Sequence, residues 1–216
     1  MGLVKPEYGP SLPALVRALP LGGRLAVAGL IALAVAGVIV VGALRDDIRT
    51  ATAVVPEPFA FNLIFREDQL RRVAPGPGER LRLETLEANR SPQRFVVRNL
   101  RLPAYRGEVG GALPLFATGL GEDLRAALPA YQPRGESPAR INDLPGYQIT
   151  FQTKVGGRTA YGKRYLLLPD EPGARDGADL ELLSVRAPAV PRPESLGVNG
   201  PLKTPLRSFR FGAERP

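Results

Sequence analysis

The sequence predicts an α+β fold: a mainly antiparallel sheet flanked by helices, preceded by a single transmembrane helix. Three observations predict it. One long apolar segment without a charge lies near the amino terminus. Beyond it, short runs of alternating apolar residues are separated by turn residues, and one stretch changes to the helical period. Consecutive strands joined by short turns favour antiparallel pairing, with helices covering one face.

The apolar segment covers residues 25–44, between Arg24 and Arg45. As a helix it spans about 30 Å, which matches the hydrocarbon core of a bilayer. The apolar region of a cleaved export signal is shorter, about 7–15 residues. We therefore expect residues 24–45 to remain as a transmembrane signal-anchor, and a cleaved signal is the alternative.

The basic residues that flank this segment indicate its orientation. Three precede it and two follow it, and the richer side faces the cytoplasm. We expect residues 1–23 to be a short cytoplasmic tail and everything after the helix to lie outside the cytoplasm. The chain is then a single-pass plasma-membrane protein. The flanking residues are Lys5, Arg17 and Arg24 on one side and Arg45 and Arg49 on the other.

Small residues recur along the apolar segment at a spacing that lets two helices approach closely. Three alanines lie four residues apart, and two glycines lie beside this row. The alternative is that small residues are common in all membrane helices of this proteome. The predicted helix-pairing residues are Ala28, Gly29, Ala32, Ala36 and Gly37.

A linker is expected between the anchor and the folded domain. Residues 46–58 end in Pro56 and Pro58, which favours an irregular connection. The predicted extracytoplasmic domain therefore covers residues 59–212. The chain beyond the anchor is long enough for one domain with a sizeable core.

The first half of this domain is expected to contain three strands and a helix. Apolar residues alternate in three runs, which is the period of a half-buried strand. The period then changes, because Leu120, Leu124 and Leu128 recur at every fourth position with acidic residues opposite. The predicted strands cover 59–67, 80–87 and 93–102, and the predicted helix covers 114–131.

The clearest local signal is a β-hairpin within residues 144–169. Two strand-like runs flank Gly156 and Gly157, which is a favoured two-residue turn. Pairing the runs directly across this turn places Phe151 opposite Gly162. A large aromatic side chain then covers a glycine, which repairs a weak position in a sheet.

This register gives the hairpin one apolar face and one polar face. It also places Arg164 on the apolar face, which requires either a bulge or a shift by one residue. The polar face is expected to be exposed and to bind a partner, because tyrosines offer flat contact area and lysines offer charge. A helix packed there, with the tyrosines as half-buried supports, is the alternative. The predicted partner-binding residues are Lys154, Tyr161, Lys163 and Tyr165.

An acidic turn followed by a strand with Leu180, Leu182 and Leu183 is expected within residues 169–186. Its carboxylates do not follow the spacing of an EF-hand, so we interpret it as a solvated turn rather than a calcium site. A short helical or irregular end follows. The acidic residues are Asp170, Glu171, Asp176, Asp179 and Glu181.

Composition narrows the range of functions. The 216 residues contain no cysteine and no histidine, which excludes disulfides, thiolate nucleophiles, histidine-based triads and zinc sites built from either residue. The net charge of +8 favours anionic partners, unless arginine is simply common on the surfaces of this proteome. We expect no enzyme, catalytic residue, metal or cofactor. The expected partners are the membrane and either another envelope protein or an anionic envelope component, and not nucleic acid.

The order of the elements resembles that of the Mog1/PsbP-like domains that actinobacterial membrane-anchored proteins carry outside the cell. At Arg66 and Leu70 the chain departs from the proline and tryptophan that are usual in that family. The resemblance implies an α+β domain for binding or assembly, with no catalytic residue to carry over. The matching pieces lie at 59–65, 144–169, 178–186 and 206–212.

Together these observations predict a bitopic membrane protein that presents a non-catalytic binding or assembly domain outside the cytoplasm. The alternative is an extracytoplasmic enzyme that uses the polar face of the 147–168 hairpin. A pocket with converging ionisable groups favours the enzyme, and a flat or apolar exposed face favours the binding module.

Overall fold

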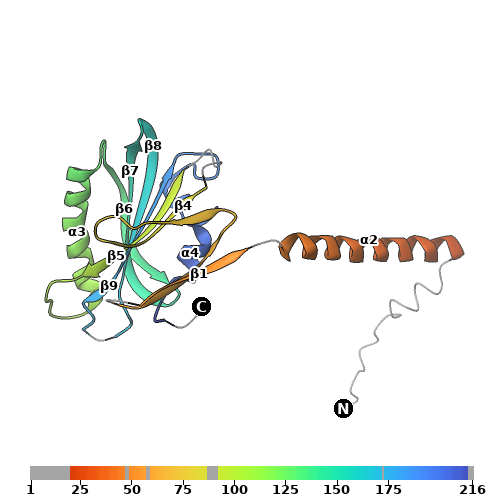
Figure 1. Cartoon of the computed structure of the whole chain (residues 1–216), viewed down its shortest axis with the longest axis horizontal. Helices are drawn as coiled ribbons and strands as arrows, with labels where there is room; N and C mark the ends of the chain where they lie inside the picture. Colours follow the sequence, from red (N-terminus) through yellow and green to blue (C-terminus); the bar gives the residue numbers. More distant parts are fainter. Residues whose placement is uncertain (1–19, 47–48, 57–58, 87–91, 172, 214–216) are drawn as a thin grey trace, which may run out of the picture. The chain divides into compact units, whose positions relative to one another are not determined.

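The chain divides into two compact units, Met1–Ile48 and Arg49–Pro216. The described part of the first unit is one helix, α2 (Leu21–Asp46) (Figure 1). Almost all of the predicted cytoplasmic tail lies outside the described residues. The computed structural model describes residues 20–46, 49–56, 59–86, 92–171 and 173–213, without the side chains of Arg24 and of residues 38–46.

Helix α2 places the predicted pairing residues on its surface. Ala28, Ala32 and Ala36 share one face, because residues four apart are neighbours on a helix. Gly29 and Gly37 lie beside them and are exposed. In the part of the chain that the structure describes, no helix is both long and apolar enough to cross a membrane. The predicted span extends past residue 37, where the description of the side chains ends, so the anchor and its pairing stay predictions.

The second unit contains two antiparallel sheets, which confirms the α+β class (Figure 1). The smaller sheet has the order β1 (Thr50–Val55), β2 (Phe61–Arg66) and β10 (Arg210–Phe211). The larger sheet has the order β3 (Leu70–Val73), β4 (Glu79–Thr85), β5 (Gln93–Arg101), β9 (Asp176–Val185), β8 (Arg158–Leu167), β7 (Leu144–Val155) and β6 (Gln132–Ile141). The remaining elements are α3 (Val109–Ala127), the 3₁₀ turn η1 (Pro193–Ser195) and α4 (Lys203–Ser208).

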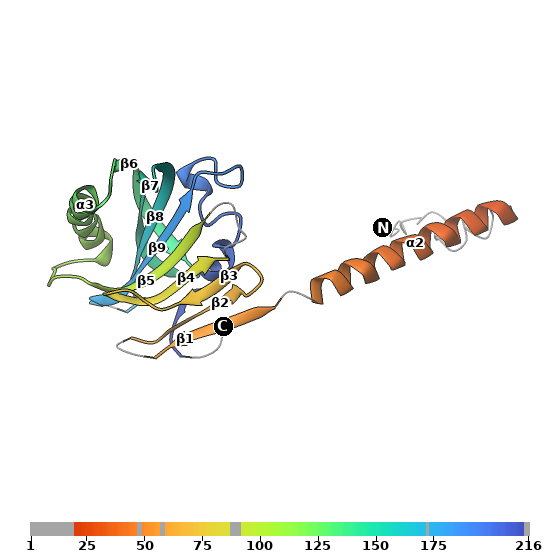
Figure 2. The ribbon, with the colours of Figure 1, turned by 45° about the horizontal axis from the view of Figure 1, so that its top comes forward.

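A hydrophobic core lies on each face of the larger sheet. Its inner face packs against the smaller sheet and α4, and this main core includes Phe61, Phe95 and Leu180. Its outer face is covered in part by α3, over a second core that includes Leu113 and Ile149. Figure 2 shows α3 and α4 on opposite sides of the larger sheet. Alternation along each strand sends successive side chains to the two cores.

The expectation of a linker is wrong for residues 50–55. Residues 50–55 form strand β1, which pairs with β2 from Thr50 opposite Arg66 to Val55 opposite Phe61. Ala53 and Val55 are buried. This run of alternating small and β-branched residues has strand period, which the two following prolines obscured. The folded domain therefore begins about ten residues earlier than expected.

Other boundaries also differ from expectation. Strand β3 and strand β6 were not predicted, and α3 begins at Val109 instead of residue 114. Pro114 lies inside α3, where tertiary packing tolerates the lost backbone hydrogen bond. Strand β6 lies at the edge of the larger sheet. An edge strand tolerates proline, whereas a central strand does not, so the prolines in this segment obscured the strand in the sequence.

The hairpin of β7 and β8 forms as predicted. Gly156 and Gly157 have φ values of 55° and 76°, which the two-residue turn requires and which glycine adopts without strain. Phe151 pairs with Gly162, and a Cβ atom on Gly162 would overlap the phenyl ring. The glycine is therefore required by the ring that covers it.

We expect Gly162→Ala to lower the free energy of unfolding by about 1–3 kcal/mol, because the added methyl group overpacks the site. Thermal and urea unfolding of the domain measure this loss. The matched control is Gly119→Ala in α3, where a Cβ atom meets nothing within 4 Å. The double variant with Phe151→Leu should recover part of the loss, and full additivity of the two changes would contradict the contact.

Candidate binding cleft

Three of the four predicted partner-binding residues lie in the protein interior. Tyr161 and Tyr165 are 6% exposed and Lys163 is 5% exposed, whereas Lys154 near the hairpin tip is exposed. The expectation of an exposed polar face is therefore wrong for β8. Tyrosine rings and lysine methylene groups are apolar, so they can be buried while their polar tips find partners.

Lys163 fastens the η1 segment to the sheet. Its Nζ donates to the carbonyl oxygens of Glu194 and Leu196, both at 3.3 Å. The same atom lies 5.8 Å from the centroid of the Tyr165 ring, within range of a cation–π contact. Burial lowers the pKa of Lys163, and the nearby charge of Glu194 opposes this shift.

Arg164 lies on the outer face of the sheet, where the expected register places it, and no bulge intervenes. It is buried and pairs with Asp179, with Nε 2.7 Å from Oδ1. Glu181, on the neighbouring strand, accepts from Arg94 and Arg98. Asp179 and Glu181 thus belong to a strand and not to the acidic turn expected from the sequence.

This ion cluster predicts a pH dependence of stability. Burial alone raises the pKa of Glu181, but the charges of Arg98, Arg94 and Arg164 lower it below its ordinary value of 4.5. A carboxyl whose pKa is lowered by folding stabilises the protein above its unfolded pKa and loses that effect as the pH falls through the folded pKa. We expect the free energy of unfolding to decrease below about pH 4.5.

Unfolding in urea across the acidic range measures this effect. In Glu181→Gln the pH dependence should become shallower, whereas Glu122→Gln on the exposed side of α3 should leave it unchanged. An unaltered pH dependence in Glu181→Gln would show that the cluster does not supply it.

A cleft of about 450 Å³ opens beside Tyr165, and we call it the tyrosine cleft. Strand β8, the β6–β7 turn, the loop after η1 and helix α4 contribute to it. One part of the lining is apolar and another carries guanidinium, amide and phenol groups. The lining residues are Arg140, Ile141, Asn142, Tyr165, Gly197, Val198, Leu206 and Arg207.

Asn142 joins two walls of this cleft. Its Nδ2 donates to the carbonyl oxygens of Arg207 and Phe209, at 2.5 and 2.8 Å. Asn142 and Asp143 have φ values of 47° and 67°, which these residue types tolerate better than most. The β6–β7 turn is thereby tied to the end of α4, so the two walls are held at fixed positions.

The Tyr165 hydroxyl group has no hydrogen-bond partner among the described residues. A few side-chain atoms in that part of the chain are fully buried and have no hydrogen-bond partner, and the Tyr165 hydroxyl oxygen is not one of them. A buried tyrosine hydroxyl usually finds a partner, so solvent or a ligand in the cleft must supply it here. Burial raises the pKa of Tyr165 to about 12, so the group is a neutral donor at physiological pH.

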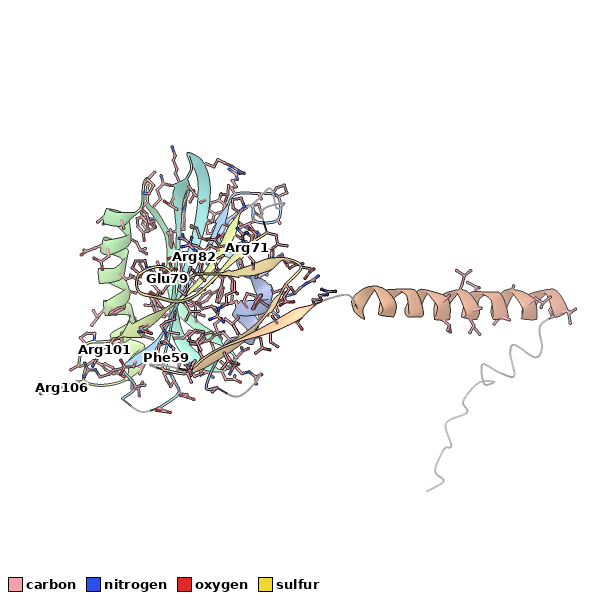
Figure 3. The ribbon with its side chains drawn as sticks, in the orientation of Figure 1. Phe59, Arg71, Glu79, Arg82, Arg101 and Arg106 are labelled. Carbon is pink, nitrogen blue, oxygen red and sulfur yellow. The ribbon has the colours of Figure 1, made fainter. Side chains whose placement is uncertain are left out.

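A second cleft, of about 560 Å³, lies between α3 and the β5–α3 loop. It is lined by Leu102, Tyr105 and Phe116 among others, and Figure 3 shows Arg101 and Arg106 at this end of the domain. The Tyr105 hydroxyl already donates to the carbonyl of Ala174, at 3.0 Å. This cleft offers apolar area and the Arg106 guanidinium group, but its tyrosine hydroxyl is already paired. The tyrosine cleft combines arginine with an unpaired hydroxyl donor, so it is the better candidate.

Sequence reasoning missed most of the tyrosine cleft. Only Tyr165 was predicted, and it was assigned to an exposed surface. The Asn142–Asp143 dipeptide was an available signal for a two-residue hairpin turn, and it would have indicated β6 as well. No local sequence pattern indicated that Arg207 lines the cleft, because the position of its side chain depends on how α4 packs against the β6–β7 turn.

Comparison with known proteins supports the fold alone. No family model matches the chain, and no curated protein matches its sequence. LpqN, which is involved in cell envelope biogenesis of Mycobacterium tuberculosis, is similar in structure: 14% identity, 77% of this chain, 93% of that chain and a TM-score of 0.51. PsbP (CyanoP) of Synechocystis sp. PCC 6803 is 10% identical in sequence, and the match covers 76% of this chain and 92% of that chain with a TM-score of 0.47. The similarity to LpqN supports the α+β fold that the element order predicted.

Proposed function

We propose that this chain is a single-pass membrane protein that presents a non-catalytic binding domain, residues 49–213, outside the cytoplasm. The observation that carries the binding role is the tyrosine cleft, in which a neutral hydroxyl donor and guanidinium groups border a cavity with an apolar wall. The similarity in fold to LpqN supports a role in the cell envelope. The partner is then another envelope protein or an anionic envelope component.

The proposed anchor is the apolar segment 25–44. It has no charged residue, and α2 covers it from end to end. Large apolar side chains on this helix, including Leu30 and Leu33, are more than half exposed. A bilayer would cover them, and the basic residues before the helix favour a cytoplasmic amino terminus.

Membrane fractionation tests the anchor. The full chain should sediment with membranes, resist washing with salt and alkali, and be released by detergent. The variant Leu30→Arg/Leu33→Arg should move to the soluble fraction, because each arginine costs about 2.5–3.5 kcal/mol at the centre of a membrane helix. Leu115→Arg, at an exposed position of α3, is the matched control and should stay with the membrane.

Protease digestion of cells stripped of their wall tests the orientation. Protease added outside should digest the domain beyond residue 49 while the membrane is intact. A domain that is cut only after the membrane is permeabilised would contradict the proposed topology, and a wild-type chain in the soluble fraction would contradict the anchor.

A further inference from the structure

We propose that the tyrosine cleft binds a small ligand with an oxyanion, a carboxylate or a phosphate, attached to an apolar group. This rests on the proposed binding role and gives it a chemical class. Arg207 of α4 and the neutral Tyr165 hydroxyl donor line a cavity that also has an apolar wall, and Arg140 of β6 borders the same cavity. Arginine and tyrosine together supply the charge and the directed hydrogen bonds that bind such an anion.

The two guanidinium groups are available for a ligand. The Arg207 side chain has no ion pair or hydrogen bond within the described residues. Arg140 has one charged neighbour, Asp143, at 4.0 Å, and both side chains are largely exposed. Such a surface pair contributes at most about 1 kcal/mol, so a ligand can replace it.

The electrostatics of the cleft favour an anion over a cation. Arg140, Arg207 and the buried Lys163 are positive, and Asp143 and Glu194 are the acids near them. The carbonyl groups at the end of α4 would repel an anion, but Asn142 donates to two carbonyl oxygens there. These two hydrogen bonds offset part of the negative end of α4, which weakens its opposition to the positive charge of the arginines that line the cleft.

The apolar wall of the cleft is the part that contacts the apolar group of the ligand. Ile141, Val198 and Leu206 contribute it, and Val198 is 47% exposed. Gly197 packs tightly against this wall, because a Cβ atom there would lie 2.7 Å from Leu206 Cδ2 and 2.8 Å from Leu182 Cδ2. An apolar group of a few carbon atoms fills this part of the cavity, while the oxyanion reaches the arginines and the tyrosine hydroxyl.

Calorimetric titration of the full chain in phosphatidylcholine nanodiscs tests the proposal, with empty nanodiscs as the blank. Hexyl phosphate and hexanoate should bind. Inorganic phosphate, which lacks the apolar group, and hexanol, which lacks the charge, should each bind at least about tenfold more weakly. Nanodiscs containing phosphatidylglycerol separate a lipid source from a free one: a lipid ligand would compete with hexyl phosphate, and a free ligand would not.

Single substitutions inside and outside the tyrosine cleft test whether the ligand binds there. Arg207→Gln and Tyr165→Phe should each weaken binding of hexyl phosphate about tenfold or more. Arg210→Gln makes the same charge change at an exposed position outside the cleft and should leave binding unchanged. Thermal unfolding of each variant shows that the fold is intact, and with 3-fluorotyrosine the ¹⁹F resonance that Tyr165→Phe removes should shift on titration.

Two results would overturn the proposal. Equal binding of hexanol and hexyl phosphate would leave a binding cleft but remove its selectivity for an oxyanion. Absence of binding by either anionic probe, or binding that Arg207→Gln and Arg210→Gln weaken equally, would remove the site. Neither result affects the fractionation and protease tests, so failure of this proposal is distinguishable from failure of the membrane topology.

Discussion

Placing a charge on the buried side of strand β1 is expected to unfold the domain. Ala53→Asp directs a carboxylate into the main core, whereas Thr52→Asp, one residue earlier, directs it to solvent. The buried charge has no partner, and β1 would separate from β2 and expose Phe61, Leu63 and Phe65. Each such side chain contributes about 1.5–3 kcal/mol when buried, so the loss approaches the whole stability of a domain.

Circular dichroism and urea unfolding of the two variants measure this effect. Thr52→Asp should unfold cooperatively at nearly the wild-type urea concentration. A fragment that begins at residue 57 should behave like Ala53→Asp, and one that begins at residue 49 should behave like the wild type. Similar stability of the fragments from 57 and from 49 would show that β1 is a linker after all.

Removing one partner of the buried ion pair is the second large expected effect. Asp179→Ala leaves the buried Arg164 with Glu181, at 3.8 Å, as its one remaining ion-pair partner among the described residues. Breaking a buried pair in this way costs about 3–5 kcal/mol, because one charge stays desolvated without its partner. Chemical unfolding measures the loss.

The matched control is Asp176→Ala, which removes a carboxylate from the exposed pair with Arg101. It should change the free energy of unfolding by less than about 1 kcal/mol. Replacing both buried partners, Arg164→Met with Asp179→Leu, should recover most of the stability, because an apolar pair of similar volume suits the site. A loss below about 1 kcal/mol in Asp179→Ala would contradict the pair.

Local patterns were enough to predict strands β2, β4, β5 and β9 and the hairpin of β7 and β8. Leu81 and Leu83 alternate, and both are buried in the main core as their spacing indicates. The pairing of Phe151 with Gly162 followed from the Gly156–Gly157 turn alone. These features depend on neighbours close in the sequence, which is why periodicity and turn chemistry find them.

The burial of polar side chains could not be predicted in the same way. Lys163 and Tyr165 look like surface residues until η1 and α4, more than 25 residues later, cover them. Arg164 looked misplaced on an apolar face because its partners, Asp179 and Glu181, lie on another strand. Long-range packing decides which polar face is exposed, and alternation alone cannot distinguish the two faces.

A crystal structure of the domain with hexyl phosphate tests the central claim most directly, which is that the domain binds its ligand through the tyrosine cleft. The account predicts phosphate oxygens about 3 Å from the Tyr165 hydroxyl and the Arg207 guanidinium group, with the alkyl chain against Val198 and Leu206. An ordered ligand elsewhere on the domain, with the tyrosine cleft holding only water, would contradict it.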